Sequence, residues 1–168
     1  MVIRRVLLLL AALLGLVMVG CSGPPAEELY AAGEKAAADS TTQAAAVDRF
    51  SELVRRYPQH PLAAKALKHL AMISQQRGQM QAAIEQYQRL LRDYPNSGEG
   101  DEAQFMIAFI YEEYLKDYTQ ARAAYQAVID KYPGSELAAS AERLLPNVGR
   151  DPEEWVQFQD SVAPARAP

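Results

Sequence analysis

The stretches RFSELVRRYP (49–58), QYQRLLRDYP (86–95) and AYQAVIDKYP (124–133) share one pattern: an aromatic residue, an apolar residue three positions later, and a terminal Tyr-Pro. The three prolines lie 37 and 38 residues apart. Self-similarity at a fixed interval of roughly 20 to 50 residues is the signature of a repeat architecture. The chain is therefore expected to stack one structural unit about three times.

Each stretch has the pattern of an amphipathic helix that ends at its tyrosine. Counted back from each proline, matching positions hold a small, an aromatic, an aliphatic and a tyrosine residue, at steps of 4, 3 and 4 that share one helix face. Proline lacks the N–H that a helix needs, and it biases the preceding residue away from the helical region. The repeat residues are Ala46, Phe50, Leu53, Tyr57 and Pro58; Ala83, Tyr87, Leu90, Tyr94 and Pro95; and Ala121, Tyr125, Val128, Tyr132 and Pro133.

A further helix is predicted to begin after each proline, which makes the repeating unit a helix pair. Pro61 suits a first helical turn, and Ser97 and Ser135 are candidate N-caps. Turns are expected at residues 76–80 and 115–119. The segment 134–145, stopped by Pro146, is half a repeat and is interpreted as a cap over the end of the stack. Such short helices are marginal alone, so each pair needs neighbours to bury its apolar face.

The N-terminus has the form of a secretory signal. Arg4 and Arg5 precede an uncharged, mostly apolar run over residues 6–19, and Cys21 follows the small Gly20. A membrane-spanning helix needs about 20 residues, so the run of 14 favours a removable signal over a retained anchor. Cys21 is the only cysteine, which excludes an intramolecular disulfide.

Composition and motifs argue against catalysis and nucleic-acid binding. Removal of residues 1–20 leaves 15 basic and 21 acidic residues, a net charge of −6, without a long basic tract. His60 and His69 are the only histidines, and His69 has no acid or cysteine at ligand spacing on its helix, so no metal site is expected. The paired acids are expected on helix surfaces, and no phosphate loop or nucleophile motif is present. We therefore predict a non-enzyme without a cofactor, small-molecule substrate or nucleic-acid partner.

The helix-pair pattern resembles the tetratricopeptide repeat (TPR), whose usual period is about 34. The resemblance covers residues 26–145 and is carried by Leu67, Leu70, Ala71, Gly78, Ala83, Tyr87, Leu90 and Pro95. In the next repeat Lys116 stands where Gly78 stands, after one inserted residue. The resemblance implies an all-α fold: a right-handed TPR-like α-solenoid of about three helix pairs over residues 26–146, with a C-terminal capping helix.

That resemblance also implies a concave surface lined by the first helix of each pair. Its groove-lining positions fall on Lys65, Lys68, Met72, Gln75 and Gln76, and on Glu102, Phe105, Phe109, Glu112 and Glu113. One wall is then basic, and the next presents two aromatic residues between acids. Such a surface suits an extended or helical peptide with Phe105 and Phe109 as anchors. The alternative, that both phenylalanines pack between repeats, stays open.

The sequence MVGC (18–21) resembles the bacterial lipobox, which implies that Cys21 becomes the lipidated N-terminus after cleavage of residues 1–20, with residues 21–25 as a linker. Together with the repeats, it is similar to the BamD-like outer-membrane-assembly lipoproteins and the YbgF/CpoB periplasmic TPR family. These families imply a scaffold that holds envelope proteins at the periplasmic face of a membrane. Ser22 is compatible with the outer membrane. A pilotin-like, transport or cell-division accessory role is the alternative, and a cell-wall enzyme is the third hypothesis.

The last segment, residues 147–168, is expected to be a tail. Its DPEEWVQF stretch has helix-starting residues and predicts a short helix at about 152–160, followed by a disordered end. Trp155 and Phe158 would share one face of that helix. Docking on the final repeat and an exposed partner site are both open.

Overall fold

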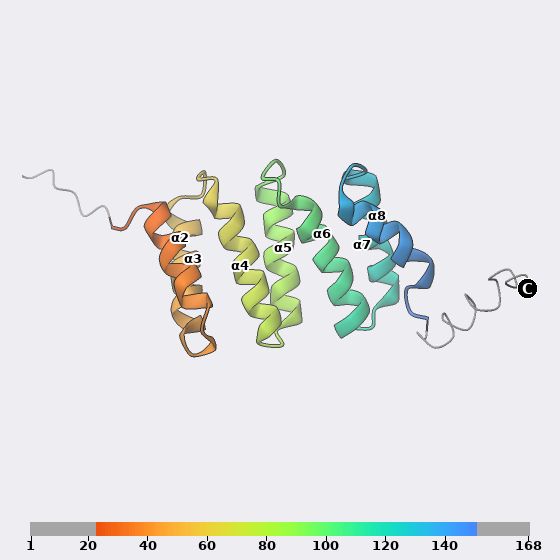
Figure 1. Cartoon of the computed structure of the whole chain (residues 1–168), viewed down its shortest axis with the longest axis horizontal. Helices are drawn as coiled ribbons and strands as arrows, with labels where there is room; N and C mark the ends of the chain where they lie inside the picture. The colour runs from red at the N-terminus through yellow and green to blue at the C-terminus, as the bar shows by residue number, and fades with distance from the viewer. Residues whose placement is uncertain (1–22, 151–168) are drawn as a thin grey trace, which may run out of the picture.

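The chain folds as a row of helix pairs. The computed structural model describes residues 23–150, and the α-helices there stand side by side in chain order (Figure 1). The predicted all-α solenoid is confirmed. The helices are α2 (Ala26–Ala37), α3 (Gln43–Arg56), α4 (Leu62–Gln76), α5 (Met80–Asp93), α6 (Gly100–Phe109), α7 (Tyr118–Lys131) and α8 (Glu136–Leu144), with short 3-10 turns at Ser40–Thr42 and Leu145–Asn147 and a π-helix at Ile110–Tyr114.

The second helix of each pair ends where the Tyr-Pro pattern predicts. Tyr57, Tyr94 and Tyr132 are the C-terminal caps of α3, α5 and α7, and each backbone N–H still donates to the carbonyl four residues earlier. The proline that follows cannot donate the next bond of the ladder. The chain therefore leaves the helix at the same point in all three pairs.

One of the two predicted serine caps is correct. Ser135 caps α8, accepting a hydrogen bond from the N–H of Leu137 at 3.0 Å. The prediction for Ser97 is wrong, because α6 begins only at Gly100. Gly98 lies between Ser97 and the start of α6. Its backbone is in the left-handed region, with φ at 79°, so the chain makes a further turn before the helix starts.

The residue inserted in the third repeat is absorbed by a π-helix. Directly after α6 the chain widens into the π-helix Ile110–Tyr114, where the N–H of Leu115 donates to the carbonyl of Ile110, five residues back. Lys116 then adopts φ of 53°, the left-handed conformation that Gly78 adopts with φ of 72° in the preceding pair. The turn is thus kept despite the extra residue.

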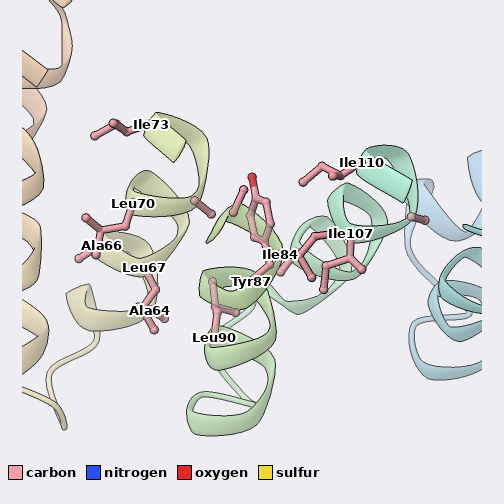
Figure 2. Close-up of a cluster of buried hydrophobic side chains, with 14 of the residues drawn as sticks. Ala64, Ala66, Leu67, Leu70, Ile73, Ile84, Tyr87, Leu90, Ile107 and Ile110 are labelled. Atoms are coloured by element: carbon pink, nitrogen blue, oxygen red, sulfur yellow. The ribbon is translucent and has the colours of Figure 1, made fainter. Parts of the chain in front are cut away.

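The core is built from the repeat residues. In each second helix the small, aromatic and aliphatic members are buried, and the terminal tyrosine is partly exposed. Tyr87 is 1 % exposed and lies on α5 with Ile84 and Leu90, facing Ile107 of α6 (Figure 2). Burial raises the pKa of Tyr87, and the carboxylate of Glu102 raises it further, so the hydroxyl remains a donor.

Each buried ring contacts one residue on the first helix of its pair or, in the third pair, on the π-helix that follows it. The hydroxyl of Tyr87 donates to Gln75, and that of Tyr125 donates to Glu112, both at 2.9 Å. Phe50 has no hydroxyl, and its ring instead lies against Gly33, where a Cβ would come within 2.6 Å of it. The first pair therefore accommodates its ring with a glycine, at a different position on the helix from the acceptors of the other two pairs.

The end of the stack is covered by more chain than the sequence indicates. Val148 is fully buried, and its carbonyl accepts a hydrogen bond from Arg122 on α7. The predicted cap thus extends past Pro146. The signal segment, Cys21 and the helix predicted at 152–160 with Trp155 and Phe158 lie outside the described residues.

Replacement of Tyr87 by alanine tests the central position of the core. We expect Tyr87→Ala to lower the free energy of unfolding by about 3 to 5 kcal/mol, because it removes a buried ring and leaves a cavity. Tyr87→Phe, which loses only the bond to Gln75, should cost about 0.5 to 1.5 kcal/mol. Urea unfolding measures both, and a cost below about 1 kcal/mol for alanine would contradict the core assignment.

Candidate protein-binding surface

The first helices α2, α4, α6 and α8 form the inner face of the solenoid. Within the described residues, α2 packs directly on α4 and α6 on α8, whereas α4 and α6, like the second helices, make no comparable contacts with one another. The first helices are thus closer together than the second helices at both ends of the row, and in repeat stacks such packing favours a concave surface on that side. Here "inner face" means the surface of these four helices that does not pack into the core.

The positions expected on α4 do not form a freely basic wall. Lys65 is exposed, but the ammonium of Lys68 lies 2.5 Å from Glu99 and 2.8 Å from Glu102 of the next repeat. Burial disfavours the charge of Lys68, yet the hydrogen bonds to the two carboxylates outweigh that effect and raise its pKa. Lys68 therefore joins two repeats and offers little charge to a partner.

The other predicted groove residues of α4 differ in their exposure and in their hydrogen bonds to the rest of the protein. Met72 is 39 % exposed. Gln75 is half-buried and accepts the hydroxyl of Tyr87, so it supports the core. Gln76 is exposed, and its side-chain oxygen accepts a hydrogen bond from Gln43.

On α6 and the π-helix, the two phenylalanines have unlike surroundings. Phe105 is half-buried and meets the ring of Tyr125 edge-on, with centroids 5.4 Å apart, so it packs against the core. Phe109 is also half-buried, but it contacts the exposed ring of Tyr114 at 6.0 Å. Phe109 is thus the better placed of the two to meet a partner.

Two of the three predicted groove acids in this region are bound to residues of other helices, and the third is exposed. Glu102 holds Lys68, and Glu112 accepts the hydroxyl of Tyr125. Burial raises the pKa of Tyr125, and the bond to Glu112 raises it further, so the tyrosine stays the donor. Glu113 is exposed and pairs only with Lys116, at 3.5 Å.

A cavity of about 310 Å³ opens on the inner face between α2 and α4. Its lining residues are Glu34, Ala37, Ala38, His69, Met72, Ile73 and Gln76. His69 stacks on Phe50 with centroids 4.7 Å apart and is hydrogen-bonded to the hydroxyl of Tyr30 at 3.0 Å. Burial lowers the pKa of His69, which favours a neutral ring.

Sequence reasoning missed the contribution of α2 to this surface. The groove positions were assigned only in the second and third repeats, but Tyr30 and Glu34 lie 38 residues before Lys68 and Met72. The interval of 37 that relates Lys68 to Phe105 and Met72 to Phe109 points to Ala31 and Lys35 instead, so the register alone would not have identified them. The inner face therefore begins at the first helix pair.

The described residues contain none of the features of a metal or membrane-spanning site. No group of three or more metal-ligating side chains occurs within residues 23–150. No helix in that range combines the length and the apolar character needed to cross a bilayer.

Comparisons with known protein families match most of the described chain. Residues 26–98 and residues 102–135 each match a family model described as "Tetratricopeptide repeat". No curated protein matches the chain. The matched residues include all of α2, α3, α4, α5 and α7, and α6 from Glu102 onward.

Replacement of Lys68 by methionine tests whether it joins two repeats. We expect Lys68→Met to lower the free energy of unfolding by about 1 to 2 kcal/mol, between the values for exposed and buried ion pairs. Because folding raises the pKa of Lys68, its contribution is complete below the ordinary lysine pKa of about 10.4 and disappears as the pH rises through the higher folded value.

The control is Lys65→Met, one helical turn away and exposed. Chemical unfolding at pH 7, 9 and 11 should separate the two variants at the two lower pH values, and the difference between them should begin to shrink at pH 11. Equal costs for both variants at pH 7 would contradict a joining role for Lys68.

Proposed function

Because this chain is a tetratricopeptide-repeat protein, we propose that it is a lipid-anchored scaffold that binds other proteins on its inner face. The observation that carries the proposal is the contrast between a closed core and an incompletely covered inner face. Met72 and the cavity beside it, together with Phe109 and Tyr114, offer apolar surface to a partner. Exposed apolar groups next to polar ones are typical of protein-binding surfaces.

The arrangement of polar groups supports binding and gives no support to catalysis. Several polar side chains of the inner-face helices are engaged within the protein, as in Lys68 with Glu99, Gln75 with Tyr87, and Glu112 with Tyr125. A reaction would need a nucleophile or an acid–base pair free to meet a substrate. The proposal therefore needs no cofactor and no small-molecule substrate, only the covalent lipid.

The lipid anchor is proposed from the sequence MVGC at 18–21, with Cys21 as the modified residue. More than one acyl chain gives lasting attachment to a membrane where a single chain does not. The first described residues are fixed to the solenoid, since the hydroxyl of Tyr57 donates to the carbonyl of Pro24 at 2.9 Å. An anchor at Cys21 would then hold the first helix pair close to the membrane.

The cellular setting follows from the same features. A lipidated N-terminus and a TPR solenoid favour the periplasmic face of a bacterial membrane, and Ser22 is compatible with the outer membrane. The process we propose is outer-membrane protein assembly or maintenance of the envelope. A pilotin-like, transport or cell-division accessory role would use the same anchor and the same surface.

Photocrosslinking from single positions tests the binding surface. A photoreactive residue placed at Met72 should form adducts with envelope proteins in intact cells, because Met72 is exposed beside the cavity. The control position is Gln88, which is exposed on the second helix α5. The same adducts from both positions, or adducts from Gln88 alone, would contradict binding at the inner face.

Metabolic labelling with a clickable fatty acid tests the anchor. We expect the wild-type protein to carry the label and to sediment with membranes, and Cys21→Ser to lose both properties because no other cysteine is present. Membrane sedimentation of an unlabelled Cys21→Ser protein would show that lipid on this residue is not the anchor.

A further inference from the structure

The charges of the solenoid are divided between its two layers of helices. The first helices and the π-helix carry nine acidic and four basic residues, whereas the second helices carry five acidic and seven basic residues. The basic residues of the first helices are Lys35, Lys65, Lys68 and Arg143. The layer that forms the inner face is therefore net acidic, and the opposite layer is net basic.

Lys68 and His69 add no free positive charge to the inner face. Lys68 is held between Glu99 and Glu102, so its charge is already balanced within the protein. His69 is neutral near pH 7, since burial lowers its pKa. A partner with basic residues is thus electrostatically favoured on this face.

The cavity between α2 and α4 places one acid of this layer beside an apolar surface. Its apolar lining comes from Ala37, Ala38, Met72 and Ile73, and the carboxylate of Glu34 is the one charged group among its lining residues. The side chain of Glu34 is 51 % exposed and lies 3.9 Å from the ring of His69, and the carboxylate also interacts with the hydroxyl of Tyr30. Glu34 therefore remains available to a cation.

We propose that this cavity takes a lysine or arginine side chain from a partner protein, with the aliphatic stem against Met72 and Ile73 and the cation at Glu34. The proposal rests on the proposed function as a protein-binding scaffold. Long basic side chains combine an apolar stem with a charged tip, which matches an apolar pocket with one acid at its edge. Met72 adds an adaptable surface that tolerates different stems.

Other side chains fit the cavity less well. A purely apolar side chain would remove water from the Glu34 carboxylate without providing a partner, which costs free energy. An acidic side chain would meet the carboxylate of Glu34 and be repelled. The chemistry of the cavity thus selects for a basic residue.

Selection from a random peptide library tests this inference on the full chain reconstituted in lipid nanodiscs. Peptides that bind the wild-type protein should be enriched in lysine and arginine. Selection on Glu34→Lys should enrich aspartate and glutamate instead, because the charge at the cavity is reversed. The matched control is Glu28→Lys, since Glu28 is exposed on the same helix and is not among the lining residues.

A synthetic peptide from the wild-type selection provides the affinity measurement. By fluorescence anisotropy, Glu34→Gln should weaken its binding about tenfold or more, whereas Glu28→Gln should change it less than about twofold. Binding should also weaken as salt is added. Circular dichroism verifies that both variants are folded.

The outcomes separate this inference from the function on which it rests. The inference would be overturned by enriched peptides that lack basic residues, or by peptides whose binding does not change when Glu34 is replaced. If these peptides still lose binding in Met72→Ala, the scaffold function survives. A library that yields no peptide dependent on any inner-face residue would contradict both.

Discussion

Each helix pair depends on its neighbour, because a pair cannot cover its own apolar face. The helix α5 has 14 residues, close to the length at which an isolated helix is only marginal. Its stability comes from packing on α4 before it and α6 after it, with Tyr87 and Ile84 buried in the stack. The Tyr-Pro ends make this possible, since they stop every second helix at the same length and let the next pair begin in register. Direct packing of α2 on α4 and of α6 on α8 brings first helices together at both ends of the row, which favours a concave inner face.

The π-helix shows how strongly that register is maintained. One extra residue in a regular α-helix would rotate every later side chain by about 100°. The insertion lies between Ile110 and Lys116, and the wider turn at Ile110–Tyr114 absorbs it. As a result Tyr125 reaches Glu112 at the same distance at which Tyr87 reaches Gln75. Single π-turns are rare in proteins overall, but those that occur are often found at functional sites. Here the π-turn also places Tyr114 beside Phe109, where both rings border the inner face.

The sequence predicts the elements and the core well, because both depend on periodicity. The Tyr-Pro ends and the buried set around Phe50, Tyr87 and Tyr125 follow from spacing alone. The late start of α6 was not predicted, since Ser97 has the residue type of a cap and only the conformation of Gly98 removes it from that position. The inner face is harder to predict because each charge depends on contacts across repeats. Lys68 and Lys65 are both lysines, yet the positive charge of Lys68 is balanced by the carboxylates of Glu99 and Glu102, which lie 31 and 34 residues later in the sequence. Glu34 is a single acid in sequence and becomes a cavity residue only when α2 packs on α4.

Native-state hydrogen exchange tests most directly whether each pair is stabilised by its neighbours. The amides of α4 and α5, which have a pair on each side, should be protected longest, and protection should fall toward α2 at one end and α8 at the other. In Tyr87→Ala the loss of protection should be greatest in α4, α5 and α6 and should extend to both ends. Equal protection in all helices of the wild-type protein, or a loss confined to α5 in the variant, would contradict a stack held together by its interfaces.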